Sequence, residues 1–232
     1  MVRCADGTGP GAFDEGQAKA YAVAIDVETE FLHDQVFLDI LRQHSRGGAL
    51  DLGGGTGRYA AWLLEMGLAT SVHVIDHSPP MIAECLRRGV PGLSAQVADI
   101  ETADLGIEKY DMALARFVLM HVIGLSDTLN RIAMSLKDKG TLAIVTNVIE
   151  GDPIALTTFL EETSGIMKLI LQVKGQPILV SNYVRMQEDY AKALQHVGLS
   201  IEFYEKYEPR ILHLEKEHPG IMLFHLVLVA KK

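Results

Sequence analysis

The chain of 232 residues is predicted to form a doubly wound α/β domain with a sheet of seven strands. Three observations predict this fold. Apolar strand-like runs alternate with helical stretches from residue 48 onward, a glycine-rich turn follows the first run, and the last two runs have no helix between them. Strands that alternate with helices form a parallel sheet, whereas the final two are expected to pair as an antiparallel hairpin.

The predicted elements follow one another in a regular order. The expected strands are 48–52, 71–76, 94–99, 111–117, 140–148, 199–206 and 221–231. Helical periodicity predicts helices at 57–66, 78–88, 126–136 and 185–197. Ser78 is placed to cap the second of these helices, ahead of Pro79 in its first turn.

Two segments stand outside this order. Residues 14–46 are helical in pattern and are expected to form a lid, after a flexible leader at 1–13. Residues 151–184 are expected to form a cap insertion, with a helix at about 153–172 followed by a loop. These segments embellish a single domain that spans 14–232.

Composition and charge narrow the class of partner. The net charge is −9 and no run of Lys or Arg stands out, so no nucleic-acid partner is expected. The two cysteines predict no structural disulfide. The beginning of the chain has no apolar signal-peptide region, and the longest apolar run is far shorter than the roughly 20 residues that span a bilayer. A cytoplasmic protein without a membrane partner is expected.

The stretch ALDLGGGTGRYA, residues 49–60, is a glycine-rich turn of the kind that approaches a ligand closely. A phosphate-binding loop needs Lys and then Ser or Thr after its last glycine, whereas Arg58 and Tyr59 follow here. GTGRYA formally satisfies the dinucleotide pattern G-x-G-x-x-A, so an NAD-dependent oxidoreductase stays open. Asp51 opposes that alternative, because a carboxylate repels a diphosphate and attracts a ligand ammonium.

The pattern D-x-G-G-G-T-G resembles motif I of class I S-adenosylmethionine-dependent methyltransferases, of the small-molecule type similar to methyltransferase domains 11 and 25. The resemblance places Asp51 on the family's acidic residue and Gly53, Gly55 and Gly57 on its three glycines. It implies a Rossmann-like sheet and S-adenosylmethionine as the cofactor. That molecule carries an ammonium and a sulfonium but no phosphate, which suits an acidic residue beside this turn.

The resemblance continues in register from 49 to 201. In VHVIDHSPPMI it implies that Asp76 takes both ribose hydroxyls and that His77 lies along the adenosine. Asp99 and Ile100 fall where the family contacts adenine. YDMALARFVLMHV, SLKDKGTLAIV and the helix before residue 201 also match. KDKGT has one glycine where two are usual, and DHSPPM lacks the commoner acidic residue after its first proline.

Arg116 ends the fourth strand, at the place where methyltransferases that act on amino groups often carry a polar residue facing the methyl group. It can bind the cofactor or an acidic acceptor group, or equally form a surface ion pair. His33, polarised by Glu30, is the first candidate for a general base, because imidazole titrates near neutral pH. Glu28 and His121 are the alternatives, although a structural role for either histidine stays open.

Further residues are expected around the acceptor. Phe37 shares a helix stripe with His33, and Tyr21 resembles a tyrosine that some small-molecule methyltransferases lay over the cofactor. Tyr183 and Arg185, at the exit of the insertion, are expected to line the same mouth. No metal site is expected.

The sequence thus predicts in-line methyl transfer to a small N-, O- or C-nucleophile under a helical lid. An aromatic or heterocyclic precursor of secondary metabolism is the expected acceptor, and a homodimer is a further expectation. Three alternatives stay open: the oxidoreductase, a partner protein of the same fold without turnover, and a methyltransferase that acts on proteins.

Overall fold

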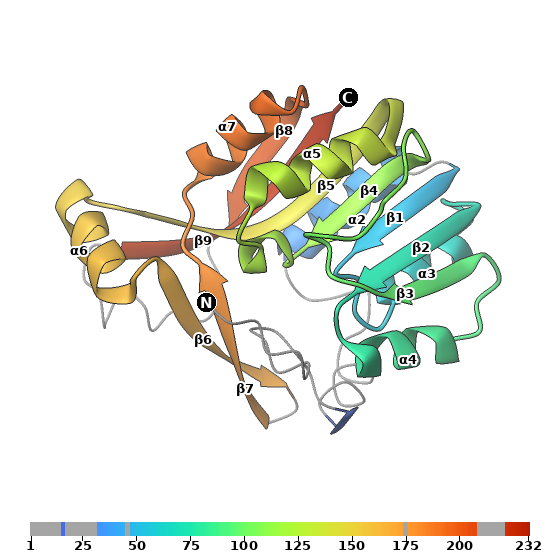
Figure 1. Ribbon diagram of the computed structural model, residues 1–232, viewed down its shortest axis with the longest axis horizontal. Helices are drawn as coiled ribbons and strands as arrows, with labels where there is room; N and C mark the ends of the chain where they lie inside the picture. The colour runs from blue at the N-terminus through green and yellow to red at the C-terminus, as the bar shows by residue number, and fades with distance from the viewer. Residues whose placement is uncertain (1–14, 17–31, 45–46, 174–175, 208–220) are drawn as a thin grey trace.

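The computed structural model describes residues 15–16, 32–44, 47–173, 176–207 and 221–232. Its centre is a seven-stranded sheet in the order β3-β2-β1-β4-β5-β9-β8 (Figure 1). The strands are β1 (Gly48–Leu52), β2 (Ser71–Asp76), β3 (Leu93–Val97), β4 (Tyr110–Arg116), β5 (Leu136–Gly151), β8 (Ser200–Tyr207) and β9 (Ile221–Lys231). Strands β1 to β5 are parallel, and β9 is antiparallel to β5 and β8. The predicted α/β sheet with an antiparallel C-terminal pair is confirmed.

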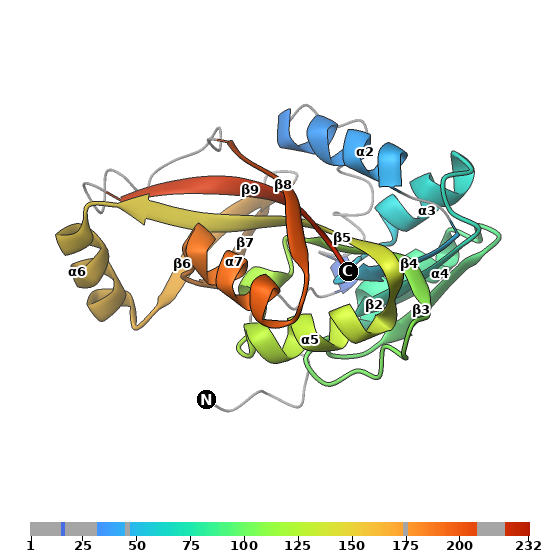
Figure 2. The ribbon, with the colours of Figure 1, turned by 90° about the horizontal axis from the view of Figure 1, so that it is seen from above.

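Helices cover both faces of the sheet (Figure 2). They are α2 (Leu32–His44), α3 (Arg58–Glu65), α4 (Pro79–Arg87), α5 (Leu125–Ser135) and α7 (Gln187–His196), and a short 3-10 helix, η1 (Leu119–His121), follows β4. On one face, Phe37, Leu63 and Ile82 from α2, α3 and α4 share a buried cluster with β1, β2, β4, β5 and β9. On the other, Leu129 and Leu194 from α5 and α7 share a second cluster. We call these the α2 face and the α5 face.

Helix α2 lies against β5 and β9 on the α2 face. Its apolar side chains Phe37, Leu38 and Leu41 are fully buried there, and this burial fixes the helix to the sheet. The prediction that 14–46 forms a lid is therefore wrong for α2, which is part of the core. The leader and most of the predicted lid lie outside the described residues.

Strand β5 is longer than the predicted strand 140–148, because it pairs with β9 along most of its length. β4 ends earlier, and its last pair joins Arg116 to Val145. Residues 146–151 of β5 and 221–226 of β9 therefore continue past the carboxyl end of β4. We call this segment the β5–β9 extension; β8 still pairs with β9 at residues 225 and 226 of it.

The insertion contains a helix, α6 (Pro153–Thr163), and two paired antiparallel strands, β6 (Ile166–Val173) and β7 (Gln176–Tyr183). The predicted helix to residue 172 and the loop after it are wrong. Ser164 and Gly165 adopt left-handed φ angles of 51° and 71°, which end the helix, and the apolar run beyond them forms β6 instead. The helix begins at Asp152, whose carboxylate accepts hydrogen bonds from the backbone N–H groups of Ile154 and Ala155.

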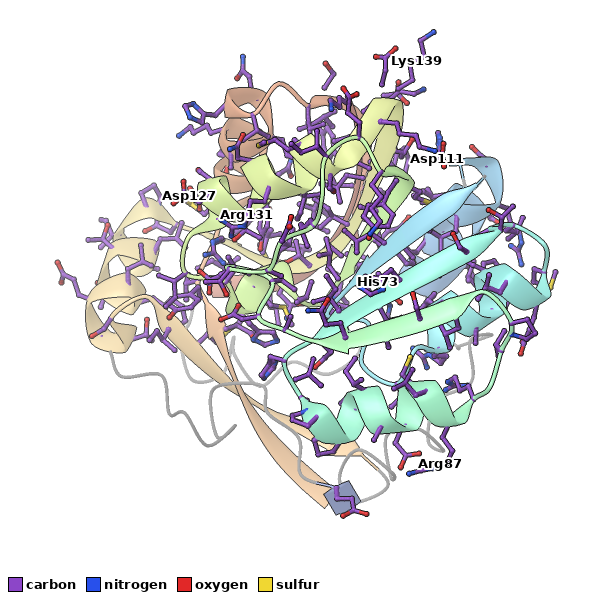
Figure 3. All side chains as sticks on the ribbon, turned by 45° about the vertical axis from the view of Figure 1, so that its right-hand side comes forward. His73, Arg87, Asp111, Asp127, Arg131 and Lys139 are labelled. Atoms are coloured by element: carbon purple, nitrogen blue, oxygen red, sulfur yellow. The ribbon has the colours of Figure 1, made fainter. Side chains whose placement is uncertain are left out.

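The β6–β7 hairpin extends along the edge of the sheet at which the parallel strands end (Figures 1 and 3). Arg185 fixes its base to the segment after β4. The guanidinium donates from Nη1 to the carbonyl oxygen of Leu119 at 2.9 Å and from Nη2 to that of Val122. The insertion thus forms one side of the edge at which an α/β sheet binds its ligands.

Candidate functional site

The glycine turn joins β1 to α3 at the carboxyl edge of the sheet. Gly53, Gly55 and Gly57 all have positive φ, at 61°, 55° and 68°. Among the described residues, a Cβ at Gly55 would have only the sulfur of Met81 nearby, at 3.8 Å, so this side of the turn leaves room for a ligand. A Cβ at Gly54 would lie 2.6 Å from the Asp51 carboxyl carbon. The turn therefore passes directly over that carboxylate.

Asp51 is buried, and its Oδ2 has no hydrogen-bond partner among the residues that the structure describes. Burial raises the pKa of Asp51 to about 7, and the nearby Asp76 carboxylate adds to this effect, while Arg116 and Arg58 oppose it. A buried carboxylate without a partner costs stability unless a ligand group satisfies it. Asp51 is therefore suited to bind a positively charged or hydrogen-bonding ligand group.

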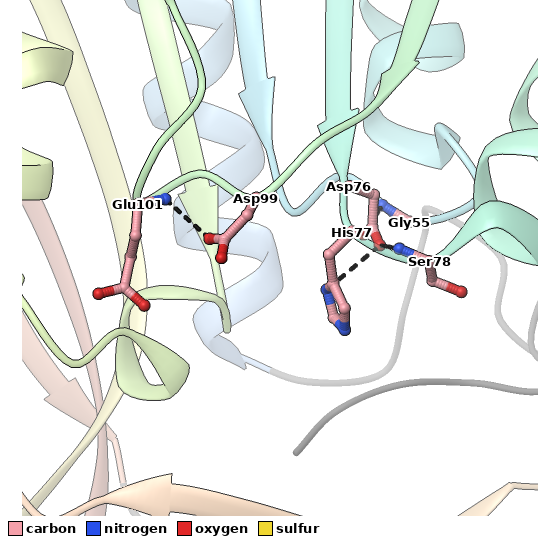
Figure 4. A network of polar contacts seen from close by, with 6 residues as sticks. All are labelled: Gly55, Asp76, His77, Ser78, Asp99 and Glu101. Atoms are coloured by element: carbon pink, nitrogen blue, oxygen red, sulfur yellow. Dashed lines mark hydrogen bonds and ion pairs between the residues drawn. The ribbon is translucent and has the colours of Figure 1, made fainter. Parts of the chain in front are cut away.

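Asp76 holds the glycine turn at the end of β2 (Figure 4). Its Oδ2 accepts a hydrogen bond of 2.9 Å from Gly55 N, and its Oδ1 accepts one of 2.9 Å from Ser78 N. Burial raises the pKa of Asp76, although these two bonds and His77, whose Nδ1 lies 3.7 Å from Oδ1, favour the ionised form. Ser78 is the N-cap residue of α4 as predicted, but its side chain makes no capping hydrogen bond.

Asp99 lies on the same edge, beyond β3 (Figure 4). Its Oδ1 accepts from Glu101 N at 2.9 Å, and Ile100 is buried in the cluster on the α5 face. Glu101, which sequence reasoning missed, accepts through Oε1 from Ile123 N at 3.1 Å and Gly124 N at 2.9 Å. This carboxylate ties the loop after β3 to the start of α5 and so fixes the wall that carries Asp99.

Two guanidinium groups flank the site on the α2 face. Arg116 Cζ lies 5.1 Å from the ring centroid of Tyr59 and 4.8 Å from that of Phe117, and Arg58 Cζ lies 5.0 Å from Tyr59. The ring of Phe37 packs edge-on against Tyr59, with centroids 5.6 Å apart. Phe37 is fully buried, so its prediction as a pocket residue is corrected to a core residue.

Sequence reasoning also missed a polar pair on the β5–β9 extension. Asn147 of β5 lies opposite His225 of β9, and Asn147 Oδ1 lies 2.8 Å from His225 Nδ1. The His225 ring packs edge-on against Phe117, with centroids 5.1 Å apart. No local signal marks this pair, because its members are 78 residues apart in the sequence.

The remaining residues that were predicted to contact the acceptor lie in several different elements or outside the described residues. Tyr21, Glu28 and Glu30 lie outside the described residues, while His33 is in the first turn of α2. His121 ends η1, and Tyr183 ends β7, with its ring centroid 5.5 Å from Arg185 Cζ. Arg185 is buried, and its donors serve the two carbonyls after β4. Its described contacts are therefore structural, and an acceptor contact stays a prediction.

Among the described residues, no group of three or more His, Cys, Asp or Glu is arranged to hold a metal ion. No helix in the described part of the chain is long and apolar enough to cross a membrane.

Residues 50–144 match the methyltransferase domain family. This stretch is similar to the class I S-adenosylmethionine-dependent methyltransferases. The cofactor of this family is S-adenosylmethionine. The matched region runs from β1 into β5 and therefore contains the glycine turn, Asp76 and Asp99.

One curated relative is a malonyl-[acyl-carrier protein] O-methyltransferase from Acetivibrio thermocellus, 30% identical over 130 residues. That match covers 56% of this chain and 46% of the relative, so the chain matches less than half of the relative's length.

Solved structures share the fold at lower identity. An S-adenosylmethionine-dependent methyltransferase from Mesorhizobium loti has a TM-score of 0.62 and 20% identity, covering 86% of this chain and 98% of the other. The [4+2]-cyclase SpnF has a TM-score of 0.64 and 15% identity, covering 90% of this chain and 84% of the other.

Proposed function

We propose that this chain transfers the methyl group of S-adenosylmethionine to a small-molecule acceptor. The observation that carries the proposal is a glycine turn flanked by two buried carboxylates, Asp51 and Asp76. This arrangement suits a cationic, phosphate-free cofactor and disfavours the diphosphate of NAD.

The residues present fit the cofactor. Asp51 Oδ2 is an orphaned acceptor that suits an ammonium group, and the open space over Gly55 leaves room beside the turn. We infer that Asp76 accepts from the ribose hydroxyls, because each of its oxygens retains a second lone pair. Asp99 and Ile100 are proposed to border the adenine.

The cofactor supplies a methyl group on a positively charged sulfur, which is already a strong electrophile. The protein's task is to align the acceptor and exclude water. We propose that the β6–β7 hairpin and the β5–β9 extension border the acceptor, with Arg116 beside the reacting centre. A lid formed by the part of 14–46 that precedes α2, with Tyr21, Glu28 and Glu30, stays part of the proposal, and so does an acceptor role for His33. So do a cytoplasmic location, a homodimer and a place in secondary metabolism.

A second candidate is methylation of a carboxyl group on a carrier protein, which the match to the malonyl-carrier relative favours. Arg116 suits an acidic acceptor of either kind, because a guanidinium binds a carboxylate through two parallel hydrogen bonds. A carrier-bound acceptor would need an open path for a second protein, whereas a free metabolite would not.

The deciding experiment has two stages. Calorimetric titration with S-adenosylmethionine, S-adenosylhomocysteine and NAD should show binding of the first two alone; binding of NAD alone would refute the proposal. Transfer of tritiated methyl is then measured to a panel of free phenols, alcohols, amines and carboxylic acids, and to malonyl-carrier protein. Labelling of the carrier alone would favour the second candidate.

A further inference from the structure

The β5–β9 extension places a polar pair directly after two apolar pairs on the α2 face of the sheet. On the α2 face, Ala143 and Val145 of β5 and Val227 and Val229 of β9 are buried core residues. Side chains on one face recur every second residue. The next position on β5 beyond Val145 is Asn147, and its cross-strand partner is His225. The apolar face of the sheet therefore gives way to an amide–imidazole pair just past the end of β4.

The hydrogen bond between these two residues sets the tautomer of the imidazole. Asn147 Oδ1 lies 2.8 Å from His225 Nδ1, and an amide oxygen is only an acceptor. Nδ1 must therefore carry the proton, which leaves the lone pair of the neutral ring on Nε2. Asn147 is buried and His225 is partly exposed, so the buried amide orients a ring that is accessible from outside.

A chain of contacts joins His225 to the floor of the cofactor site. The His225 ring packs edge-on against Phe117, and the guanidinium carbon of Arg116 lies 4.8 Å from the Phe117 ring centroid. The positive charge of Arg116 also acts on Asp51, where it opposes the rise in pKa that burial causes. The glycine turn also abuts this segment, because a Cβ at Gly53 would overlap the Val118 side chain.

The insertion contributes a second unusual group near the same extension. Asn182 of β7 is 1% exposed, and within the described part of the chain neither its Oδ1 nor its Nδ2 has a hydrogen-bond partner. Its cross-strand partner, Met167, packs in a cluster with Ile149 and Leu223 of the extension. Directly opposed side chains lie on one face of a hairpin, so Asn182 belongs to this side too. A buried amide without partners points to a ligand group that completes it.

We infer that His225, oriented by Asn147, is the general base for an acceptor that loses a proton on methylation, and that Asn182 hydrogen-bonds this acceptor. The inference rests on the proposed function and names its acceptor class: a compound with an O–H or N–H group at the reacting atom. A carboxylate acceptor needs no base, because it is already ionised.

In this step His225 Nε2 takes the proton from the acceptor, and the acceptor atom forms its bond to the methyl carbon as the carbon–sulfur bond breaks. The electron pair of the broken bond stays on sulfur, which leaves as a neutral thioether. The imidazolium then returns its proton to solvent. His225 is thus a catalytic residue, whereas Asn147 is a positioning residue that acts through it.

The first test reads the tautomer directly and needs no acceptor. Long-range ¹H–¹⁵N spectra of the full chain resolve the ring nitrogens of its nine histidines, and His225→Gln assigns the signal of interest. The inference expects the Nδ1–H tautomer in the wild type and in Asn147→Asp, which retains an acceptor, and its loss in Asn147→Leu. An Nε2–H tautomer in the wild type would overturn the assignment.

The second test uses the tritiated-methyl assay with the panel of phenols, alcohols, amines and carboxylic acids. His225→Gln should lower kcat by about 100-fold or more with protic acceptors, while the calorimetric Kd for S-adenosylmethionine stays unchanged. Asn182→Leu should raise KM more than it lowers kcat. Thr146→Val is the matched control, because it removes a buried hydrogen bond to Tyr190 from the opposite face of the same strand and should leave kcat unchanged.

The outcomes separate this inference from the function on which it rests. A His225→Gln variant within threefold of the wild type, or methylation of carboxylic acids alone, would overturn the role of His225 while methyl transfer stands. A wild-type protein that does not bind S-adenosylmethionine would instead refute the proposed function.

Discussion

We expect the Asp51→Asn variant to gain stability relative to the wild type as the pH rises from 5 to 8. The comparison is made on the protein without ligand. Asp51 is buried, and its pKa is raised from 3.8 to about 7. In the unfolded chain this carboxyl ionises near pH 4, whereas in the folded protein it keeps its proton until about pH 7. Its contribution therefore becomes less favourable as pH rises from about 4 to about 7, because the folded state alone resists ionisation.

The magnitude follows from the shift. About three pKa units correspond to roughly 4 kcal/mol, an upper limit that is reached only above pH 7. Between pH 5 and pH 8 the same titration gives a change of about 2–3 kcal/mol in the free energy of unfolding. Asn has nearly the same shape and does not titrate, so any cost of its amide group is constant with pH and cancels from this difference.

Urea unfolding, followed by the fluorescence of the single tryptophan, measures this effect at constant ionic strength. The matched control is Asp111→Asn, at the opposite end of the sheet (Figure 3). Burial alone would raise the pKa of Asp111, but hydrogen bonds from Lys137 and Gly48 lower it overall, so its difference should stay flat between pH 5 and 8. A flat difference for Asp51→Asn would refute the argument that burial dominates at this position.

Three further changes test the site and its surroundings. Asp76→Ala removes the acceptor for both Gly55 N and Ser78 N, so calorimetry should detect no S-adenosylmethionine binding; unchanged affinity would contradict the ribose assignment. Gly54→Ala places a Cβ 2.6 Å from the Asp51 carboxyl carbon. This overlap should lower the free energy of unfolding, measured with urea, by about 1–3 kcal/mol. An unchanged stability would show that the turn is free to move. Asn182→Leu replaces an unpartnered buried amide with an apolar side chain of similar size. The free energy of unfolding should rise by about 1 kcal/mol or more, which raises the thermal midpoint by a few degrees. A lower midpoint would mean that Asn182 stabilises the fold.

The parts of the fold that local sequence determines were predictable. The glycine turn and Asp76 occupy the ends of their strands as expected, because a strand, a turn and the next helix are set by neighbouring residues. The insertion was not predictable in this way. Its apolar run around Met167 satisfies a helical and a strand pattern equally, and only the pairing of β6 with β7 decides between them.

The residues that we propose to border the acceptor could not be predicted from the sequence, for a related reason. A carboxylate at the end of a parallel strand is visible in the sequence because each strand of such a sheet ends at the same edge. The β5–β9 extension breaks that rule, since an antiparallel partner supports β5 beyond the end of β4. Asn147 and His225 therefore lie where no single strand would place a site, and only the register of two distant segments brings them together.

The groups that local sequence places and the groups that distant segments bring together are proposed to bind different molecules. The turn after β1 and the ends of β2 and β3 carry the groups that we propose to bind the cofactor. The extension and the β6–β7 hairpin surround the remaining side of the edge with His225, Asn147 and Asn182, none of which the glycine turn requires. We therefore expect changes confined to these two segments to alter the acceptor while the cofactor floor stays intact. Asp51 and Asp76 take their hydrogen-bonding and electrostatic partners from β2, β4, the start of α3, η1 and the loops after β1 and β2.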